Sequence, residues 1–376
     1  MKIVIVSGIW PPDVGGPASH APEVAAFLGD RGHGVEVVVT AGARPAPRPF
    51  PVHWTSRRLP PGARHAASAA LIARRARQAD IVYSTGLFAR TALAARAARR
   101  PYVLKLTGDP AFERARWRGA VAGDVEAFQR GGGGLQADGL RRLRNRVVRS
   151  AAFVFCPSDY LCRLAVGWGA DPGRVEVLPN PAPAVNGLPD RDELRAAHGV
   201  GPRTLVFAGR LTPQKALGTL LAATAQVPDA TLLIVGDGPE RGAVAAAVSE
   251  LGLESRVRLL GPQPRERTLE LARAADAAVL SSAWENFPHA VVEALAVGTP
   301  VVATNVGGVA EVVQDGVNGL LVPPQDVGAL AAALRRVLDD TPFRERLAAS
   351  AAGSVAAYAP ELIYGRLEDV LAKVAR

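Results

Sequence analysis

Residues 277–313 read AAVLSSAWENFPHAVVEALAVGTPVVATNVGGVAEVV, and this stretch decides the class of fold. It contains an apolar strand at 277–282, a helix that begins at Pro288 and a second apolar strand at 300–304. Strands that are apolar throughout are buried on both faces, which is typical of parallel sheets covered on both sides by their connecting helices. The stretch therefore predicts a strand–helix–strand unit of an α/β protein.

The same alternation extends over nearly the whole chain, with a proline-rich linker at 179–190. It predicts two Rossmann-like, doubly wound parallel-sheet domains, 1–182 and 183–355. We expect the C-terminal helix, 356–376, to pack back on the N-terminal domain. Six strands are predicted on each side of the linker, at 2–7, 35–40, 80–85, 102–107, 152–158, 174–180, 203–209, 231–236, 256–261, 277–282, 300–304 and 319–324.

The composition argues against several classes of protein. The chain has 376 residues, of which 48% are hydrophobic and 21% charged, as in a globular protein rather than a disordered or fibrous one. The net charge of +9 comes almost entirely from arginine, because only four lysines are present. These arginines are scattered and aromatic residues make up only 5%, so we expect no nucleic-acid partner.

Metal and membrane signals are weak as well. Two cysteines are too few for a disulfide framework, and no metal-ligand cluster or DxD-type carboxylate pair is evident. No apolar stretch approaches the roughly 18 residues of a membrane span. We therefore predict a cytoplasmic protein without metal or cofactor. The basic segment 141–149 predicts either a solvated helix face or a surface for peripheral contact with the inner face of the membrane or for steering an anionic substrate.

Glycines and cations follow the first strand of each predicted domain, where doubly wound sheets bind their ligands. Gly15 and Gly16 place backbone N–H groups at a helix start, which attracts anions. Arg210 and Lys215 follow the strand at 203–209, and two cations there suit a diphosphate. Each signal is weak alone, because glycine pairs often form turns and cations often lie on surfaces.

Two glutamates flank the start of the helix in the deciding stretch. Glu285 ends the strand, and Glu293 lies inside the helix that begins at Pro288. Side chains eight positions apart can contact different parts of one extended ligand, and carboxylates accept hydrogen bonds from vicinal sugar hydroxyls. Gly307 and Gly308 then form a second tight turn. Together these positions indicate a site for a sugar-bearing ligand.

The whole set of motifs closely resembles the family 4 glycosyltransferases of the GT-B fold. The shared motifs are the glycine pair, GR…K after the linker, the E-x7-E pair, GTPVVAT, GG..E and DGVNGLLVPPQD, with 203–326 as the most specific part. The stretches GIWPPDVGGPASH, LTGDPAFERA and PSDYLCRLAVGWG are similar to a bacterial and archaeal subgroup. The resemblance implies two domains that face each other across a cleft. It also implies metal-independent, retaining hexosyl transfer from a UDP-sugar or GDP-mannose to a hydroxyl of a small-molecule, glycan or lipid-linked acceptor.

The resemblance further implies a catalytic set. Arg210 and Lys215 would neutralise the donor diphosphate, whose negative charge grows as its bond to the sugar breaks. Glu285 would accept hydrogen bonds from the sugar hydroxyls. Many family members carry a histidine after the fifth strand of the N-terminal domain, where this chain has Gly108 and Asp109. Asp109 is expected either to take over a contact with sugar or acceptor, or to form an ordinary Asp–Pro turn.

The donor-binding set implied by the resemblance adds backbone groups and one carboxylate. Glycine amides would contact the diphosphate, amides beside Glu285 would contact the sugar, and a helix carboxylate would bind the ribose. These residues are Gly15, Gly16, Asn286, Phe287, Pro288 and Glu293.

Other functions remain open at this point. A nucleotide-sugar epimerase or a phosphorylase of the same fold would use a similar donor site. A protein that binds a nucleotide sugar without turning it over is also compatible with the missing histidine. An epimerase would convert the donor alone, whereas a binding protein would release no nucleotide with any acceptor.

Overall fold

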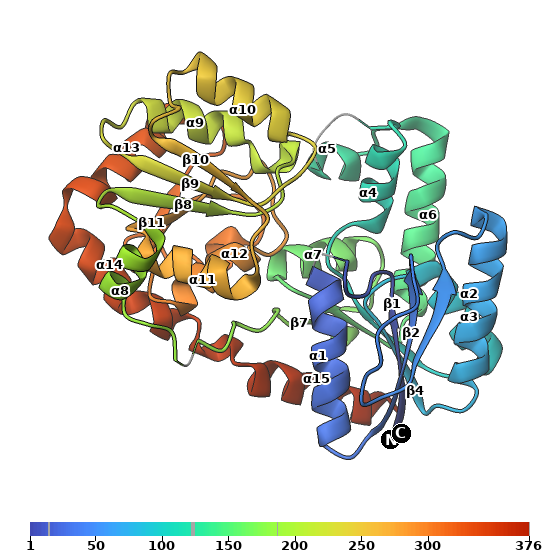
Figure 1. The fold of residues 1–376 in the computed structure, drawn as a ribbon. Coiled ribbons are helices and arrows are strands. Elements are labelled where there is room, and N and C mark those ends of the chain that lie inside the picture. Colours follow the sequence, from blue (N-terminus) through green and yellow to red (C-terminus); the bar gives the residue numbers. More distant parts are fainter. Residues whose placement is uncertain (14–15, 122–124, 186, 376) are drawn as a thin grey trace. The chain divides into compact units, whose positions relative to one another are not determined.

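The computed structural model describes residues 1–13, 16–121, 125–185 and 187–375 (Figure 1). The chain divides into two compact units. Unit 1 comprises Met1–Asn180 together with Glu361–Arg376, and unit 2 comprises Pro181–Pro360. The division on the N-terminal side of unit 2 falls within the proline-rich segment 179–190, and the final helix belongs to unit 1.

Unit 1 is built on a parallel sheet of seven strands in the order β3-β2-β1-β4-β5-β6-β7. The order reverses between β1 and β4, which makes this pair the switch point of a doubly wound sheet. The elements before the linker are β1 (Lys2–Ser7), α1 (Gly16–Asp30), β2 (Gly34–Ala41), β3 (Val52–Ser56), α2 (Pro61–Ala76), β4 (Ile81–Ser84), α3 (Phe88–Ala98), β5 (Tyr102–Lys105), α4 (Pro110–Trp117), α5 (Val125–Gln129), α6 (Gly134–Ser150), β6 (Phe153–Cys156), α7 (Asp159–Gly167), η1 (Pro172–Arg174) and β7 (Val175–Val177).

Unit 2 is built on a second parallel sheet, with six strands in the order β10-β9-β8-β11-β12-β13. Its strands follow one another along the chain with a helix between most pairs. The elements are α8 (Arg191–His198), β8 (Thr204–Ala208), η2 (Pro213–Lys215), α9 (Leu217–Ala225), β9 (Thr231–Val235), α10 (Arg241–Glu250), β10 (Val257–Gly261), α11 (Arg265–Ala274), β11 (Ala277–Leu280), α12 (His289–Ala296), β12 (Val301–Thr304), η3 (Val309–Glu311), β13 (Gly319–Val322), α13 (Val327–Asp339), α14 (Thr341–Ser354) and η4 (Ala356–Tyr358).

The apolar strands of unit 2 are buried on both faces, as their sequences predict. Successive side chains of a strand point to opposite faces. In β8, Leu205 and Phe207 join one hydrophobic cluster with α9, α10 and α13, whereas Val206 joins a second cluster with α11 and α12. The helices therefore cover both sides of the sheet. This confirms the prediction of two doubly wound α/β domains.

One strand was not predicted from the sequence. The edge strand β3 (Val52–Ser56) pairs with β2 in parallel and is not among the six strands predicted before the linker. His53 lies in this strand, and its Nε2 is 2.9 Å from Glu36 Oε2 on β2. The burial of β3 is only partial, with one buried residue among five, so its sequence lacks the continuous apolar run that marks the other strands.

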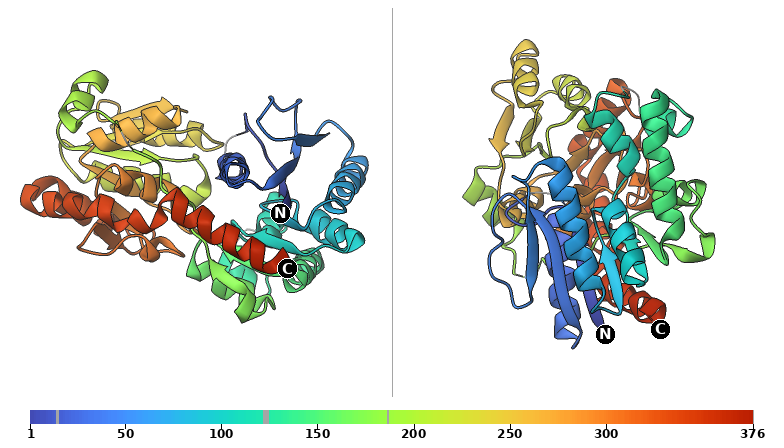
Figure 2. Two further views of the ribbon diagram at one scale, coloured as in Figure 1. Left: turned by 90° about the horizontal axis from the view of Figure 1, so that it is seen from below. Right: turned by 90° about the vertical axis from the view of Figure 1, so that its right-hand side faces the viewer.

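The last helix, α15 (Pro360–Ala375), packs on unit 1 from Glu361 onward. The Tyr364 hydroxyl donates to Glu23 Oε2 at 2.6 Å, and Glu368 Oε1 is 2.8 Å from His33 Nε2. Figure 2 shows the last turns of this helix, in red, near the N-terminus of the chain. No helix in the described part of the chain combines the length and apolarity that crossing a membrane requires.

Candidate functional site

The loops after β8 and β9 pack backbone against backbone at the carboxyl edge of the sheet in unit 2. A Cβ atom on Gly236 would lie 1.9 Å from the Gly209 carbonyl oxygen, and one on Gly238 would lie 2.2 Å from that of Leu211. The Leu211 N–H donates to the Asp237 carbonyl at 3.0 Å and fixes the approach. Only glycine fits at 236 and 238, so these two glycines fix the path of the loop that carries the predicted cations.

Lys215 and Glu285 form the centre of the candidate site. Lys215 ends the short helix η2, and its Nζ lies 2.5 Å from Glu285 Oε2. The same oxygen accepts a hydrogen bond from the Ser282 hydroxyl at 3.2 Å, and the Ser281 hydroxyl donates to the Lys215 carbonyl at 2.7 Å. The side chains are 16% and 9% exposed, so a partly open cation is held beside a nearly buried carboxylate.

The ion pair was not predicted, because the two residues were assigned to different parts of the donor. Gln214 was missed altogether; its side-chain amide donates to the Trp284 carbonyl at 2.9 Å and to Glu285 Oε1 at 3.4 Å. The position of Gln214 next to Lys215 was the only available signal for it. These contacts tie the segment 213–215 to the strand–helix turn that contains Glu285.

Arg210 lies in the loop after β8 and is exposed. Among the described residues the structure records no hydrogen bond or ion pair of its guanidinium. It lies in the same loop as Lys215, but no contact recorded among the described residues joins it to Lys215 or Glu285. Arg210 is therefore an exposed cation beside the site.

The turn from β11 into α12 presents backbone N–H groups. Neither the Asn286 nor the Phe287 amide has a backbone or side-chain acceptor among the described residues. The Phe287 side chain is 6% exposed and packs on Tyr358 with ring centroids 6.0 Å apart, so this residue offers a ligand its backbone alone. Pro288 precedes the first residue of α12, which has no side-chain cap. Free amides at a helix start suit an oxygen-rich, anionic ligand.

The other unit 2 residues that the sequence analysis singles out, Gly307, Gly308 and Glu293, lie near this turn in the chain. The Gly308 N–H donates to the Glu285 carbonyl at 3.2 Å, and Gly307 adopts a φ of 52° that favours glycine. Glu293 lies on α12, where its Oε1 is 3.3 Å from Arg265 Nε. The sequence did not predict this ion pair.

Asp109 has a structural environment in unit 1. It caps α4, where its Oδ1 accepts from the Ala111 and Phe112 amides at 2.9 and 3.2 Å. Its Oδ2 accepts from Gln129 Nε2 at 2.8 Å and lies 2.5 Å from Arg144 Nη1. Both oxygens are engaged and the side chain is fully buried. These contacts are those of an Asp–Pro turn at a helix start. They leave neither carboxylate oxygen available to a sugar or an acceptor.

Part of the segment 141–149 is held by the protein itself. Arg144 pairs with Asp109 and stacks over Trp168, 4.1 Å from the ring centroid. Arg141 lies over Phe128 at 4.1 Å, and its Nη2 donates to the Phe128 carbonyl at 2.8 Å. Arg142, Arg146 and Arg149 are exposed. Contact of this segment with a membrane stays a prediction.

The glycine pair of unit 1 is described only in part. Gly16 is the first residue of α1, whereas Gly15 lies outside the described residues. Within the described ranges of the chain, no group of three or more His, Cys, Asp or Glu side chains is arranged to hold a metal ion.

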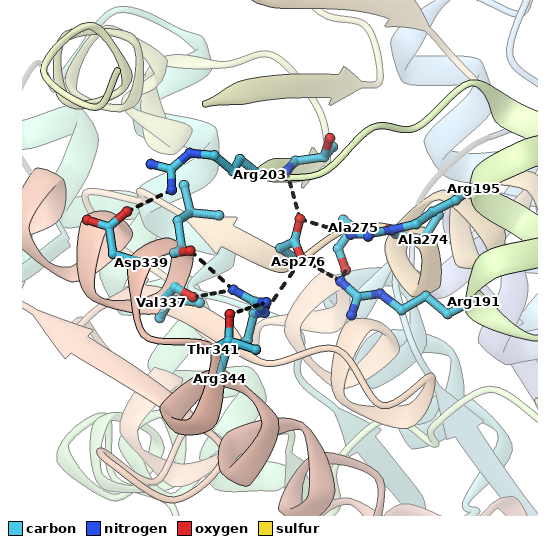
Figure 3. A network of polar contacts seen from close by, with 12 residues as sticks. Arg191, Arg195, Arg203, Ala274, Ala275, Asp276, Val337, Asp339, Thr341 and Arg344 are labelled. Carbon is cyan, nitrogen blue, oxygen red and sulfur yellow. Dashed lines mark hydrogen bonds and ion pairs between the residues drawn. The ribbon is translucent and has the colours of Figure 1, made fainter. Parts of the chain in front are cut away.

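A large polar network lies at the opposite edge of the unit 2 sheet (Figure 3). Asp276 directly precedes β11, and its carboxylate lies within 3.5 Å of arginines 191, 195 and 344 and accepts from the Thr204 amide at 2.9 Å. Burial raises the pKa of Asp276, but the Thr204 N–H and the three arginines together hold it below its usual value. The network ties α8 and α14 to the sheet and lies at the edge opposite the ligand edge.

Family models match both halves of the chain. Residues 15–181 match the glycosyl transferase 4-like domain, and residues 190–353 match the glycosyl transferases group 1. Together the two matches, each to a glycosyltransferase domain, extend over most of the chain. The Lys215–Glu285 pair and the turn into α12 lie within the group 1 domain.

Relatives support this assignment over part of the chain. Over 189 residues the chain is 42% identical to D-inositol 3-phosphate glycosyltransferase of Mycobacterium sp. strain KMS. The match covers 48% of this chain and 43% of that protein, so it spans less than half the length of the relative.

Solved structures share the fold of the two glycosyltransferase domains. HepE of Anabaena in complex with UDP-glucose aligns with a TM-score of 0.81 at 24% identity, over 99% of this chain and 100% of that one. Sucrose-phosphate synthase of Thermosynechococcus elongatus aligns with a TM-score of 0.82 at 20% identity, over 99% and 98%. At these identities the likeness concerns the fold.

Proposed function

We propose that the protein transfers a hexosyl group from a nucleotide-diphosphate sugar to an acceptor hydroxyl, with retention of anomeric configuration and without a metal ion. The observation that carries the proposal is the Lys215–Glu285 pair, 2.5 Å apart beside two amides that have no acceptor in the described part of the chain. A cation, a carboxylate and free N–H groups are what a diphosphate sugar needs. A UDP-sugar or GDP-mannose is the proposed donor, and HepE, a protein of the same fold, binds UDP-glucose.

The proposed mechanism relies on charge that grows during the reaction. As the bond from the anomeric carbon to phosphate breaks, negative charge develops on the leaving diphosphate. Lys215 and Arg210 stabilise that charge more strongly than the charge of the intact donor, which lowers the barrier. By the family resemblance, Gly15 and Gly16 supply further amide N–H groups to the diphosphate. The departing phosphate oxygen takes the proton of the acceptor hydroxyl, so the reaction needs no protein base, and Asp109 has no part in it.

Glu285 and Glu293 orient the donor in this proposal. Glu285 is held by Ser282 and Lys215, so its carboxylate is fixed before the sugar binds. The Asn286 and Phe287 amides lie beside it in the chain and contact sugar or phosphate oxygens, while Pro288 ends the turn. Glu293 binds the ribose hydroxyls and exchanges its contact with Arg265 for them. The fixed geometry contributes to rate by positioning the anomeric carbon.

The first test compares Lys215→Ala with the wild type. Loss of one donor of transition-state stabilisation costs about 2–4 kcal/mol, so turnover should fall roughly 30- to 10³-fold. Turnover is measured as nucleotide released from UDP- and GDP-sugars in the presence of an acceptor mixture, with and without EDTA. Glu250→Gln, at an exposed site on α10, is the matched control and keeps full turnover. Full turnover in Lys215→Ala would contradict the role of Lys215 at the diphosphate. Loss of wild-type turnover in EDTA would contradict the metal-independent mechanism.

Two alternatives give different outcomes in the same experiment. A nucleotide-sugar epimerase converts the donor with no acceptor present. A non-catalytic binding protein shows a thermal shift with one nucleotide sugar but releases no nucleotide. The anomeric configuration of the product, read by proton coupling constants, tests retention.

A further inference from the structure

A cavity of about 280 Å³ in unit 1 is lined by residues of helices α2, α3, α4 and α6. Figure 1 shows where these helices lie in the fold. Leu106, which lines it, directly follows β5, and Leu87 lies in the short loop between β4 and α3. The cavity therefore lies at the carboxyl edge of the sheet, next to the switch point between β1 and β4. Ligands of doubly wound sheets bind at this edge.

The walls of the cavity are mostly apolar. Leucine, valine, phenylalanine, proline and alanine side chains supply most of the lining, and α6 contributes Leu140, Leu143 and Val147. Among the described residues no carboxylate or side-chain amide lines the cavity. Sugar hydroxyls are recognised by such groups, so these walls do not suit a bare sugar. They suit a hydrocarbon segment.

Three arginines and one histidine, His65, also line the cavity. Arg90, Arg114 and Arg144 belong to its lining, and Arg144 is neutralised by Asp109. Arg90 donates only to a neutral partner, the Ser68 hydroxyl, at 2.9 Å. In the described part of the chain neither Arg90 nor Arg114 forms an ion pair with a carboxylate. Two uncompensated guanidiniums therefore border an apolar space.

The electrostatics of Arg90 reflect this excess of positive charge. Burial, followed by the neighbouring charges of Arg64 and Arg114, lowers the pKa of Arg90 to about 10. A cation surrounded by cations in a partly buried place is destabilised, and an anion bound there relieves the repulsion. Phosphate fits this role, because arginine binds it through two parallel hydrogen bonds.

We propose that this cavity binds the acceptor of the reaction, and that the acceptor carries a phosphate beside an apolar segment. The phosphate contacts Arg90 and Arg114, and the apolar segment packs on Leu87, Leu106 and Leu140. The identification of this ligand as the acceptor rests on the proposed function; the binding chemistry does not. The phosphate belongs either to a free molecule or to a lipid headgroup.

The test titrates the full-length protein with hexyl phosphate, inorganic phosphate and hexanol in a calorimeter. Hexyl phosphate should bind at least tenfold more tightly than either fragment. Each added methylene from ethyl to hexyl should strengthen binding by up to about fourfold, as expected when a methylene is fully buried. Equal affinity for hexyl phosphate and inorganic phosphate would show an adventitious anion only and overturn the proposal.

Matched arginine variants identify the site. Arg114→Gln and Arg90→Gln should each weaken hexyl phosphate binding at least tenfold, whereas Arg142→Gln, at an exposed position of α6 outside the cavity, should leave it unchanged. Arg90→Gln also removes the contact with Ser68, so Arg114→Gln, at an exposed position, is the decisive variant. Wild-type affinity in Arg114→Gln rejects the cavity as the site.

Two further measurements separate the sources and the hypotheses. Co-sedimentation with phosphatidylcholine vesicles that contain dihexadecyl phosphate, abolished by Arg114→Gln, indicates a lipid-borne phosphate. Hexyl phosphate binding without co-sedimentation indicates a free molecule. The thermal shift caused by UDP or GDP is followed in the same samples. If hexyl phosphate binds but UDP and GDP cause no thermal shift, the proposed function is contradicted. If UDP or GDP causes a shift but hexyl phosphate does not bind, the cavity proposal is contradicted.

Discussion

Lys105 is a completely buried lysine at the end of β5. Its Nζ donates to the Leu178 carbonyl oxygen. Burial lowers the pKa of Lys105 to about 7, against smaller opposing effects of Cys156 and Cys162. In the folded protein the amine is therefore neutral above about pH 7, whereas in the unfolded chain it stays protonated up to about pH 10.4.

The free energy of unfolding should depend on pH through this lysine. Between about pH 10 and pH 7 the unfolded chain binds more protons than the folded one, so stability falls as the pH is lowered through this range. Lys105→Met removes the dependence, which amounts to about 3–5 kcal/mol over the range. It also leaves the Leu178 carbonyl without its donor, a cost of about 1–3 kcal/mol that does not vary with pH.

Urea unfolding at pH 7, 8.5 and 10 measures the effect. The curve of stability against pH should be flatter for Lys105→Met than for the wild type. Lys373→Met, at an exposed position, should follow the wild type. Parallel curves for the wild type and Lys105→Met would contradict the prediction.

The contacts of a side chain could be predicted where its partner lies close in sequence. The Asp–Pro pair at 109–110 signals a helix cap, because aspartate is favoured at that position and proline at the next. The Asp109–Arg144 and Lys215–Glu285 pairs join residues 35 and 70 positions apart. No periodicity in the sequence connects such partners. They are set by which strands lie next to each other and by the length of the loops.

At the scale of elements, the contact between the β8 and β9 loops is the tightest feature of the candidate site. Gly236 has a φ of 135°, and its α-carbon faces the Gly209 carbonyl. Gly236→Ala must therefore separate the two loops. We expect a loss of about 1–3 kcal/mol, as for overpacked sites, together with weaker nucleotide binding because the loop of Arg210 moves.

Gly218→Ala is the matched control for this variant. Gly218 lies in α9, and a Cβ there would meet nothing within 4 Å. Alanine should stabilise the helix by about 0.4–1 kcal/mol. Thermal unfolding with and without UDP or GDP compares the two variants. Equal stability of Gly236→Ala and the wild type would show that the loops can separate at no cost.

Strands differ in how well their sequences predict them. The central strands are apolar at most positions because helices cover both faces, so a run such as TLLIV in β9 is recognised directly. The edge strand β3 has the sequence VHWTS and is mostly half-buried. A half-buried edge strand has no distinctive run, so its assignment depends on pairing with β2, which the sequence does not show.

At the scale of the whole molecule, the chain crosses from unit 1 to unit 2 and returns. The last helix, α15, follows unit 2 in sequence but belongs to unit 1. Its buried residues form one face and are Ile363, Tyr364, Leu367, Val370 and Leu371. The spacing predicts a helix with one buried side. The spacing alone does not say which unit covers that side. The structure assigns the helix from Glu361 onward to unit 1, the N-terminal unit on which it was expected to pack.

Leu367→Ala tests whether α15 supports unit 1 in particular. The side chain is fully buried, so its truncation should cost about 2–5 kcal/mol. Because the helix packs on unit 1, backbone amides of β1, β2 and α1 should exchange hydrogen faster, while those of β8 to β13 keep their protection. Leu362→Ala, with a side chain 61% exposed on the same helix, should change neither unit. Equal loss of protection in both sheets would mean that α15 stabilises the two units together, and the proposed donor site of unit 2 would then depend on the last residues of the chain.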